Sequence, residues 1–345
     1  MKKFINFIEK NLVKIAIYTL ILGVLTILIF TFKTPFNDWS FNADPELFGL
    51  YGNFIGGFVG TLFSLVAVFF LYKTLIAQQR TLNAQDNAIK NQQENYEIIR
   101  FETTFFNLLK TQQEITVSIK SCFNSLNNDF STKIHSVNGR EFFAYSKSEL
   151  TNILNVIDND NYLGTYDESE IEYYQHEVEE LTNPDSLKFT ADADNQAMLI
   201  FERVKLRLTN KQYQISKDYW EQVHETKTVN KLEASYGLFF QRYHYVIGHY
   251  FRHLYHLINF VHQFENSKSD FKGISKKYID FIQAQMSSYE MMLLFYNAIS
   301  FPKLLKLLIT YNFLENLAVE DLIDKTHNCI SGVNLKERKR LLGYD

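Results

Sequence analysis

Residues 49–72 read GLYGNFIGGFVGTLFSLVAVFFLY and contain no charged side chain. A helix rises about 1.5 Å per residue, so this run is long enough to cross a hydrocarbon core of about 30 Å with some tilt. Residues 15–32, IAIYTLILGVLTILIFTF, are also uncharged and nearly as long. No small-residue cleavage site follows them, and the next apolar run comes too soon for a signal peptide. The two runs therefore predict a transmembrane hairpin.

Basic residues flank the predicted hairpin on one side of the membrane: Lys2, Lys3, Lys10 and Lys14 precede the first span, and Lys73 and Arg80 follow the second. The loop between the spans holds Asp38, Asp44 and Glu46 against Lys33. Because lysine and arginine favour the cytoplasmic side, we expect both termini to be cytoplasmic. Trp39 in the loop suits the opposite interface, where aromatic rings lie at headgroup depth.

Small residues recur every four positions in the second predicted span: Gly52, Gly56, Gly60 and Ser64. On a continuous helix they would line one groove, in which another helix backbone can approach closely. The partner is either the first span of the same hairpin or the same span of a second copy. Asn53, beside the groove, is expected to hydrogen-bond across helices rather than to bind an ion.

Residues 73–100 are rich in glutamine and asparagine and carry a heptad repeat. Its apolar positions are Leu75, Leu82, Ile89 and Tyr96, and a glutamine follows each of the first three by three residues. A seam that is half apolar and half polar makes a weak coiled coil, which would need the membrane tether to associate. The pattern predicts a helical stalk, either as a coiled coil or as a single helix.

The rest of the chain, residues 101–345, has apolar residues at helical spacing and no sustained alternation of the kind that strands show. The predicted fold class is therefore all-α. It comprises a membrane hairpin over residues 1–72, a stalk over 73–100 and an α-helical cytoplasmic domain over 101–345. Residues 158–185 hold many acidic residues and no Lys or Arg, and we expect them to form an acidic insertion, either a solvated loop or an exposed helix.

The composition excludes several classes of function. A formal net charge of -4 argues against a globally basic nucleic-acid binder. Cys122 and Cys329 are too few for a disulfide framework or a four-cysteine zinc site. The chain lacks G-x-x-x-x-G-K-[ST], G-x-G-x-x-G, G-x-S-x-G and H-E-x-x-H. Nucleotide hydrolysis, dinucleotide chemistry, serine hydrolysis and zincin proteolysis therefore lose their usual sequence signatures.

Histidines concentrate between His244 and His262, and three of them, His249, His253 and His256, share one helical face. Two imidazoles on a helix bind zinc only with further ligands and supporting carboxylates, yet residues 238–263 contain no Asp or Glu. We therefore expect no metal and no cofactor. The histidines are expected to hydrogen-bond to neighbours or to line a polar groove.

Two arginine–histidine pairs lie on the same predicted helix: Arg242 with His249, and Arg252 with His256. An arginine that stabilises charge and a histidine that moves a proton are what metal-free RNA cleavage requires. The first pair is similar to the loose R-x4-6-H pattern of HEPN-type ribonucleases, although Tyr243 stands where that family prefers a polar residue. These four residues are the catalytic candidates of an alternative function that would also need a dimer.

Several blocks of the sequence match a known family in their order: GNFIGGFVGTLFSLVAVFFLYKT with the glutamine-rich helix after it, RFETTFFNLLKTQQEI, and HYFRHLYHLINFVHQF with AQMSSYEMMLLFYNAIS. Together they resemble the AbiC-like family of phage abortive infection proteins over roughly residues 35–320. The resemblance implies a bacterial antiviral protein of the inner cell membrane, with a double-span anchor and an α-helical cytoplasmic domain. It implies no known reaction.

The resemblance extends to single positions: Phe105, Phe106 and Leu109; His249, Tyr250, Phe251, Arg252 and Tyr255; and Gln285, Ser287, Glu290, Tyr296 and Asn297. Gln283 stands where a basic residue is expected, which argues against a phosphate-binding role there. Arg252 and Glu290 each lie on an otherwise apolar helix, where an unpaired buried charge is costly. We therefore predict that these two side chains pair across their helices.

Three functions follow as hypotheses. The first is a non-enzymatic sensor or effector of phage defence, in which a phage-encoded trigger acts on the cytoplasmic helices. The second is the HEPN-like ribonuclease, which alone would need a nucleic-acid partner. The third is a non-catalytic membrane scaffold. In all three the lipid bilayer is a partner, and a homo-oligomer through the second span and the stalk is expected.

Overall fold

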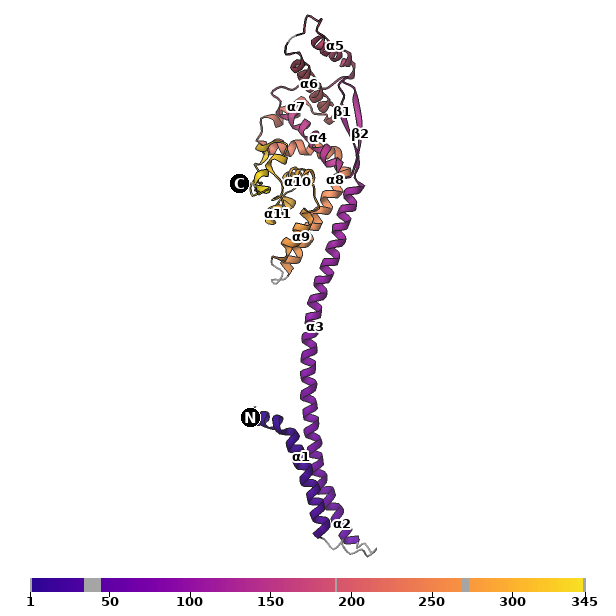
Figure 1. Cartoon of the computed structure of the whole chain (residues 1–345), viewed down its shortest axis with the longest axis vertical. Helices are drawn as coiled ribbons and strands as arrows, with labels where there is room; N and C mark the ends of the chain where they lie inside the picture. The colour runs from indigo at the N-terminus through magenta and orange to yellow at the C-terminus, as the bar shows by residue number, and fades with distance from the viewer. Residues whose placement is uncertain (1, 34–44, 190, 268–272, 344–345) are drawn as a thin grey trace. The chain divides into compact units, whose positions relative to one another are not determined.

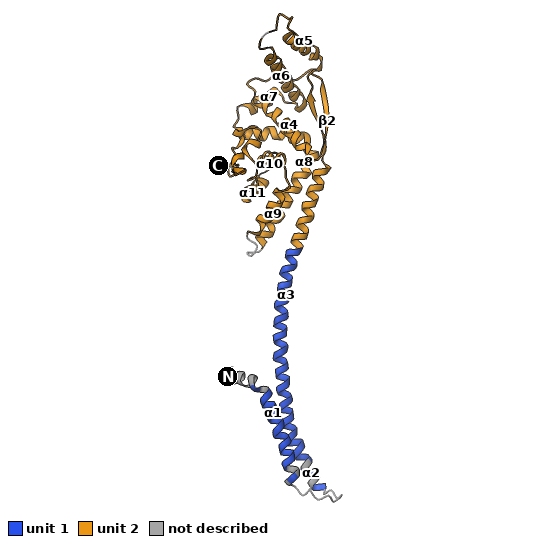
Figure 2. Cartoon of the chain, viewed as in Figure 1, with its two compact units in different colours: residues 1–99 blue, residues 100–345 orange. Residues whose placement is uncertain are grey.

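The computed structural model describes residues 2–33, 45–189, 191–267 and 273–343, which are mostly helical (Figure 1). The chain divides into two compact units, Met1–Ile99 and Arg100–Asp345 (Figure 2). The loop predicted to lie outside the membrane, with Asp38, Trp39 and Asp44, falls outside the described residues.

The first unit is built from helix α1 (Lys2–Lys33), helix α2 (Pro45–Phe54), the π-helix η2 (Ile55–Val59) and the first part of helix α3 (Gly60–Ser118). One described helical stretch, Gly52–Ser118, is long and apolar enough to cross a membrane. The apolar part of α1, Val13–Ile29, is shorter. One of the two predicted spans is thus found by length and composition, and the membrane hairpin stays a prediction.

Helix α1 packs on η2 through small and branched residues. Ala16 and Gly23 are buried on α1, and Val59 and Val66 are buried on η2 and α3. The members of each pair are seven residues apart, a spacing that keeps side chains on one side of a helix. A Cβ atom on Gly23 would lie 4.0 Å from Val59 Cγ1, so the missing side chain lets the two helices approach closely.

The π-helix η2 interrupts the predicted glycine groove. Its hydrogen bonds run from residue i to i+5, as where Gly60 donates its N–H to the carbonyl of Ile55, so it has more residues per turn than an α-helix. Residues on either side of it therefore no longer share a face at four-residue spacing. Gly52, Gly56 and Ser64 are exposed, and a Cβ on either glycine would meet nothing within 4 Å. Helix α1 packs instead on the side of η2 that carries the buried Val59.

Helix α3 crosses the boundaries that were predicted at residues 72 and 100 without a break. Residues 61–118 contain neither glycine nor proline, so no residue there disfavours a continuous helix. The heptad positions Leu75, Leu82, Ile89 and Tyr96 are all exposed. Their seam is therefore uncovered in the single chain, and the coiled coil stays a prediction.

A β-hairpin begins the second unit after α3. Strand β1 (Lys120–Leu126) pairs antiparallel with β2 (Thr132–Asn138), with Lys120 opposite Asn138. The all-α prediction holds for most of the described chain but misses this hairpin. Its strands bury only Ser121 and Phe123 from β1 and Val137 from β2, so the alternation is too weak to separate them from a polar break.

The helices of the second unit are α4 (Glu141–Asp158), α5 (Ile171–Thr182), α6 (Ala193–Tyr213), α7 (Lys217–His224), α8 (Thr228–Ser267), α9 (Ile274–Gln283), α10 (Ser288–Ser300), α11 (Pro302–Thr310) and α12 (Arg338–Leu341). The long helix α8 contacts α4, α6, α7, α9, α10 and α11. Its apolar face therefore forms the centre of the main hydrophobic core.

The acidic range 158–185 contains a largely exposed helix, one of the two forms predicted for it, and is not a loop throughout. It contains the 3₁₀-helix Glu168–Glu170 and α5, which packs on α6. A small separate core lies between these elements and the tip of the β-hairpin, built from Phe130, Tyr166, Tyr174 and Val204. Aromatic residues thus stabilise this part of the second unit. The acidic composition of the range does not indicate such a core.

Candidate functional site

Helix α10 carries a charged residue into the core of the second unit. Ser287 is its N-cap, and its hydroxyl accepts a hydrogen bond from the Glu290 N–H at 3.3 Å. In return the Glu290 carboxylate accepts from the Ser287 N–H at 2.7 Å. This is the reciprocal capping box that the S-x-x-E spacing favours. Only 2% of Glu290 is exposed, because the helix that it begins is buried on almost every side.

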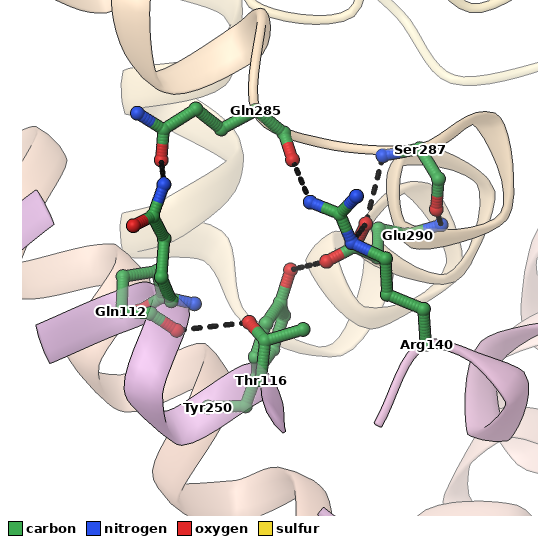
Figure 3. Close-up of polar contacts among 8 residues, drawn as sticks. Gln112, Thr116, Arg140, Tyr250, Gln285, Ser287 and Glu290 are labelled. Atoms are coloured by element: carbon green, nitrogen blue, oxygen red, sulfur yellow. Dashed lines mark hydrogen bonds and ion pairs between the residues drawn. The ribbon is translucent and has the colours of Figure 1, made fainter. Parts of the chain in front are cut away.

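Two further groups contact the buried Glu290 carboxylate, one a cation and the other a hydroxyl (Figure 3). Arg140, immediately before α4, places its Nε 3.4 Å from Glu290 Oε2. Tyr250 on α8 donates its hydroxyl to Glu290 Oε1 at 3.2 Å. Burial raises the pKa of the Tyr250 hydroxyl, and the negative charge of Glu290 adds to that shift, so it acts as a hydrogen-bond donor at neutral pH. The carboxylate thus joins α4, α8 and α10.

The same network reaches the last turns of α3. Arg140 Nη2 donates to the Gln285 carbonyl at 2.5 Å, and Gln113 Nε2 donates to the Gln285 side chain at 2.8 Å (Figure 3). One position earlier, Gln112 Oε1 lies 2.8 Å from Nδ1 of His253 on α8. We call the set Gln112, Gln113, Arg140, Tyr250, Gln285, Ser287 and Glu290 the Glu290 network. It ties the end of α3 to α8 and to the turn before α10.

The predicted pairing of Arg252 with Glu290 is wrong. The structure pairs Glu290 with Arg140 and leaves the Arg252 side chain exposed. Arg252 lies two residues after Tyr250 on α8, and this offset turns it away from the face that Tyr250 presents to α10. The prediction assumed that Arg252 is buried. Because its guanidinium is exposed to water, it needs no protein partner.

Arg252 instead lines a pocket of about 250 Å³ between α8, α10 and α11. The lining is mostly aromatic and aliphatic, with one buried amide and two cations: Phe240, Gly248, Phe251, Arg252, Tyr255, Asn297, Phe301, Lys303 and Leu304. Asn297 donates its amide to the Tyr236 hydroxyl at 2.7 Å, while its Oδ1 has no partner among the described residues. We call this the α8–α11 pocket.

Residues 242–322 match the family model described as "Putative phage abortive infection protein". The resemblance to this family is confirmed over that segment. No curated protein and no solved structure matches the chain at a significant level.

The matched residues, which we call the family segment, run from Arg242 in the first half of α8 to just beyond the 3₁₀-helix Val319–Asp321. The family segment includes Tyr250, Gln285, Ser287 and Glu290 of the Glu290 network and most of the α8–α11 pocket. Eight of the family-like positions thus gather at two places in the fold: Tyr250, Gln285, Ser287 and Glu290 in the network, and Phe251, Arg252, Tyr255 and Asn297 in the pocket. Arg140, helix α1, the apolar start of α3 and the RFETTFF block lie outside the matched residues.

Tyr296 has a different role from the other family-like positions. Its hydroxyl lies 2.7 Å from Nδ1 of His327 and accepts a hydrogen bond from the Ile323 N–H at 3.1 Å. Burial lowers the pKa of His327, although Asp324 nearby opposes the shift, so the ring is neutral at pH 7. Tyr296 therefore fastens the segment after α11 onto α10.

The arginine–histidine pairs are not brought together in one pocket. Arg242 donates to the Gln212 carbonyl at 3.3 Å, and its guanidinium lies 5.6 Å from the centre of the Tyr213 ring. His249 and His256 are exposed, and the α8–α11 pocket that Arg252 lines contains no histidine. Within the described ranges no group of three or more His, Cys, Asp or Glu side chains is arranged to hold a metal.

A second buried carboxylate, Glu149 on α4, was missed from the sequence. It accepts hydrogen bonds from Gln212 and from Tyr213 Oη at 2.7 Å, with Tyr243 Oη at 3.5 Å. Burial raises the pKa of Glu149, an effect that the Tyr213 hydrogen bond and the positive charge of Arg242 oppose. These contacts lie between α4, α6 and α8, so they connect the family segment to the rest of the second unit.

Proposed function

We propose that this chain is a membrane-anchored bacterial protein of antiphage defence, which acts by abortive infection through its helical second unit. The observation that carries the proposal is the family match over residues 242–322. The matched residues include a buried, fully partnered carboxylate and an open pocket, so the segment has both a fixed framework and an accessible surface. A framework with an adjoining pocket suits a sensor or effector that responds to a phage-encoded trigger.

The anchor is supported by the surface of the first unit. Large apolar side chains are exposed along both of its long helices: Ile17, Leu20, Ile21, Leu25, Leu28 and Ile29 on α1, and Phe63, Leu65, Val68, Phe70 and Leu71 on α3. A soluble protein rarely leaves so large a contiguous apolar area in water. Spans at residues 15–32 and 49–72, with both termini in the cytoplasm as the lysine and arginine bias predicts, would place this surface in lipid.

Association of copies is supported by two uncovered surfaces. Gly52 and Gly56 have open space in front of them, and the heptad residues from Leu75 to Tyr96 are exposed along one helix. Chains tethered in one membrane have a high effective concentration, so even a weak coiled coil can pair them. We therefore propose a parallel homo-oligomer through the second span and the stalk.

No specific observation favours the ribonuclease. Arg242, the arginine of the first pair, already contacts the Gln212 carbonyl and the Tyr213 ring. Arg252, the arginine of the second pair, lines a pocket that contains no histidine. Cleavage would need both groups within hydrogen-bond reach of one phosphate. A ribonuclease site would therefore need a second copy of the chain to supply the histidine. RNA integrity is recorded for this reason in the experiment that follows.

The proposal is tested by challenging bacteria with phage while they carry one of four versions of the gene. These are the intact chain, the chain from residue 74 onward, the intact chain with its hairpin replaced by an unrelated two-span hairpin, and His249→Ala. We expect protection from the intact chain, loss of protection without the hairpin, and recovery with the unrelated hairpin, because anchoring is its role.

Plaque counts, membrane potential and total RNA are recorded in the same cultures. Full protection by the version without the hairpin would contradict membrane anchoring. RNA degradation that His249→Ala abolishes would favour the ribonuclease. Early loss of membrane potential that only the natural hairpin produces would mean that the hairpin itself is the effector. Absence of protection by every version would leave the scaffold as the better hypothesis.

A further inference from the structure

The α8–α11 pocket has the size and lining of a site for one small ring system. Its volume of about 250 Å³ lies just below the range of roughly 300–1,000 Å³ that is usual for ligand sites. Phe240 and Phe301 meet edge to face in its wall, with ring centres 5.7 Å apart. Phe251 and Tyr255 from α8 also line it. Flat aromatic groups pack well on such walls by stacking or edge contacts.

One buried amide makes the pocket more than an apolar hollow. Asn297 is 1% exposed, and its Oδ1 has no hydrogen-bond partner among the described residues. Buried polar atoms in native proteins are nearly always partnered, by protein, water or ligand. The amide nitrogen is already used by the Tyr236 hydroxyl, which fixes the side chain. Asn297 lines the pocket, so a small shift of its side chain would bring Oδ1 to a ligand N–H, which would supply the missing donor.

The charges around the pocket are of one sign. Arg252 and Lys303 both line it and are exposed, and within the described chain neither has an ion-pair partner. No Asp or Glu lines the pocket, and neither residues 238–263 of α8 nor helix α11 contains one. An anionic group is therefore attracted without a competing carboxylate, and a guanidinium beside an ammonium suits a phosphate in particular.

From these features we propose that the α8–α11 pocket binds a nucleoside monophosphate. The base lies among the aromatic side chains and donates an N–H to Asn297 Oδ1, and the phosphate contacts Arg252 and Lys303. A fatty acid would match the apolar wall and the cations but has no donor for the buried amide. Inorganic phosphate would match the cations and leave the aromatic wall unused. The inference stands on the pocket alone and does not depend on the proposed role in phage defence.

Gly248 offers a way to close the pocket without disturbing the fold. It lies on α8 in the lining, and a Cβ there would be in ordinary contact, 3.9 Å from Phe240 Cζ. Gly248→Leu should therefore fill the pocket, and replacing a helical glycine tends to stabilise a helix. Gly237→Leu is the matched control, because Gly237 is on the same helix, exposed, outside the pocket and faces open space.

The test is calorimetric titration of the purified full chain in detergent with AMP, GMP, CMP and UMP, and separately with inorganic phosphate and dodecanoate. We expect at least one nucleotide to bind, and Gly248→Leu to abolish that binding while Gly237→Leu leaves it unchanged. Arg252→Gln and Lys303→Gln should each weaken it by about tenfold, the effect of losing one charge-assisted hydrogen bond. Thermal unfolding of each variant checks that the fold is kept.

Three results would overturn the proposal: no nucleotide bound by the natural chain, equal binding by Gly248→Leu, or binding of phosphate or dodecanoate as tight as that of the nucleotides. None of these results depends on phage. Loss of the proposed defence function and loss of this site can therefore be told apart.

Discussion

Replacing Arg140 by methionine should destabilise the second unit more than an ordinary surface ion pair would allow. Arg140→Met removes the cation 3.4 Å from a carboxylate that is only 2% exposed. Hydrogen bonds to charged groups contribute about 1.5–3 kcal/mol, and the lower half of that range applies here because the Arg140 side chain is 59% exposed. We therefore expect a loss of about 1.5–2 kcal/mol in the free energy of unfolding.

The matched control is Lys110→Met on α3. Lys110 Nζ lies 3.8 Å from Glu114 Oε1, and both side chains are mostly exposed. Exposed pairs of this kind contribute about 0–1 kcal/mol, usually near the lower end. The Lys110 variant should therefore unfold almost as the natural chain does, although the same kind of charge has been removed.

Tryptophan fluorescence of the full chain in detergent measures both variants. Trp220 donates its indole N–H to the Val156 carbonyl at 3.1 Å and stacks on His224, so it reports unfolding of the second unit. Trp39→Phe in every version leaves it as the single reporter. For a unit of this size the expected loss lowers the midpoint temperature by about 3–8 °C.

A double-mutant cycle decides whether the loss comes from the ion pair. Glu290→Gln keeps a capping-box residue but removes the buried charge. The double variant Arg140→Met/Glu290→Gln should therefore lose less than the sum of the two single losses. Additive losses, or a loss for Arg140→Met no larger than for Lys110→Met, would refute the assignment of Arg140 as the partner of Glu290.

Three further predictions concern stability. Because burial raises the pKa of Glu149, its ionisation costs the folded state stability as the pH rises above about 4.5, the pKa of the unfolded chain. Glu149→Gln removes this cost, so it should stabilise the protein at pH 7 and lose this advantage as the pH falls. Burial lowers the pKa of His327, so its contribution should fade as the pH drops below about 6.5, and His327→Gln should remove that loss of stability on acidification. Denaturant unfolding at pH 7.5 and 5.5 measures both, and an unchanged pH dependence would contradict either. Gln214 ends α6 at a φ of 52°, so Gln214→Gly should raise stability by about 1 kcal/mol, and a loss would contradict this.

Local patterns predicted much of the second unit, and long-range contacts account for what they missed. The apolar periodicity of α8 predicts its buried face. The capping box at Ser287 was not predicted, although its S-x-x-E spacing could have indicated it. The partner of Glu290 lies 150 positions earlier along the chain, and no local pattern indicates which arginine meets it. Glu149 was detectable, since it follows the buried Phe142 by seven residues and shares its helix face.

The glycine groove shows a second limit of sequence patterns. Residues at four-residue spacing from Gly52 to Ser64 share one face only if the helix is an α-helix throughout, and the five-residue π-helix shifts the face within that range. A π-helix has no composition of its own that separates it from the α-helices around it. The sequence therefore locates the small residues of this span, but it does not show which of them share a face.

Infection at two ratios of phage to cells distinguishes abortive infection from other kinds of defence. Abortive infection sacrifices the infected cell before it releases phage. Cultures carrying the intact chain should therefore survive when few cells are infected at first and collapse when nearly all are, with few progeny phage released in either case. Normal phage release per infected cell, or survival of the fully infected culture, would contradict the account.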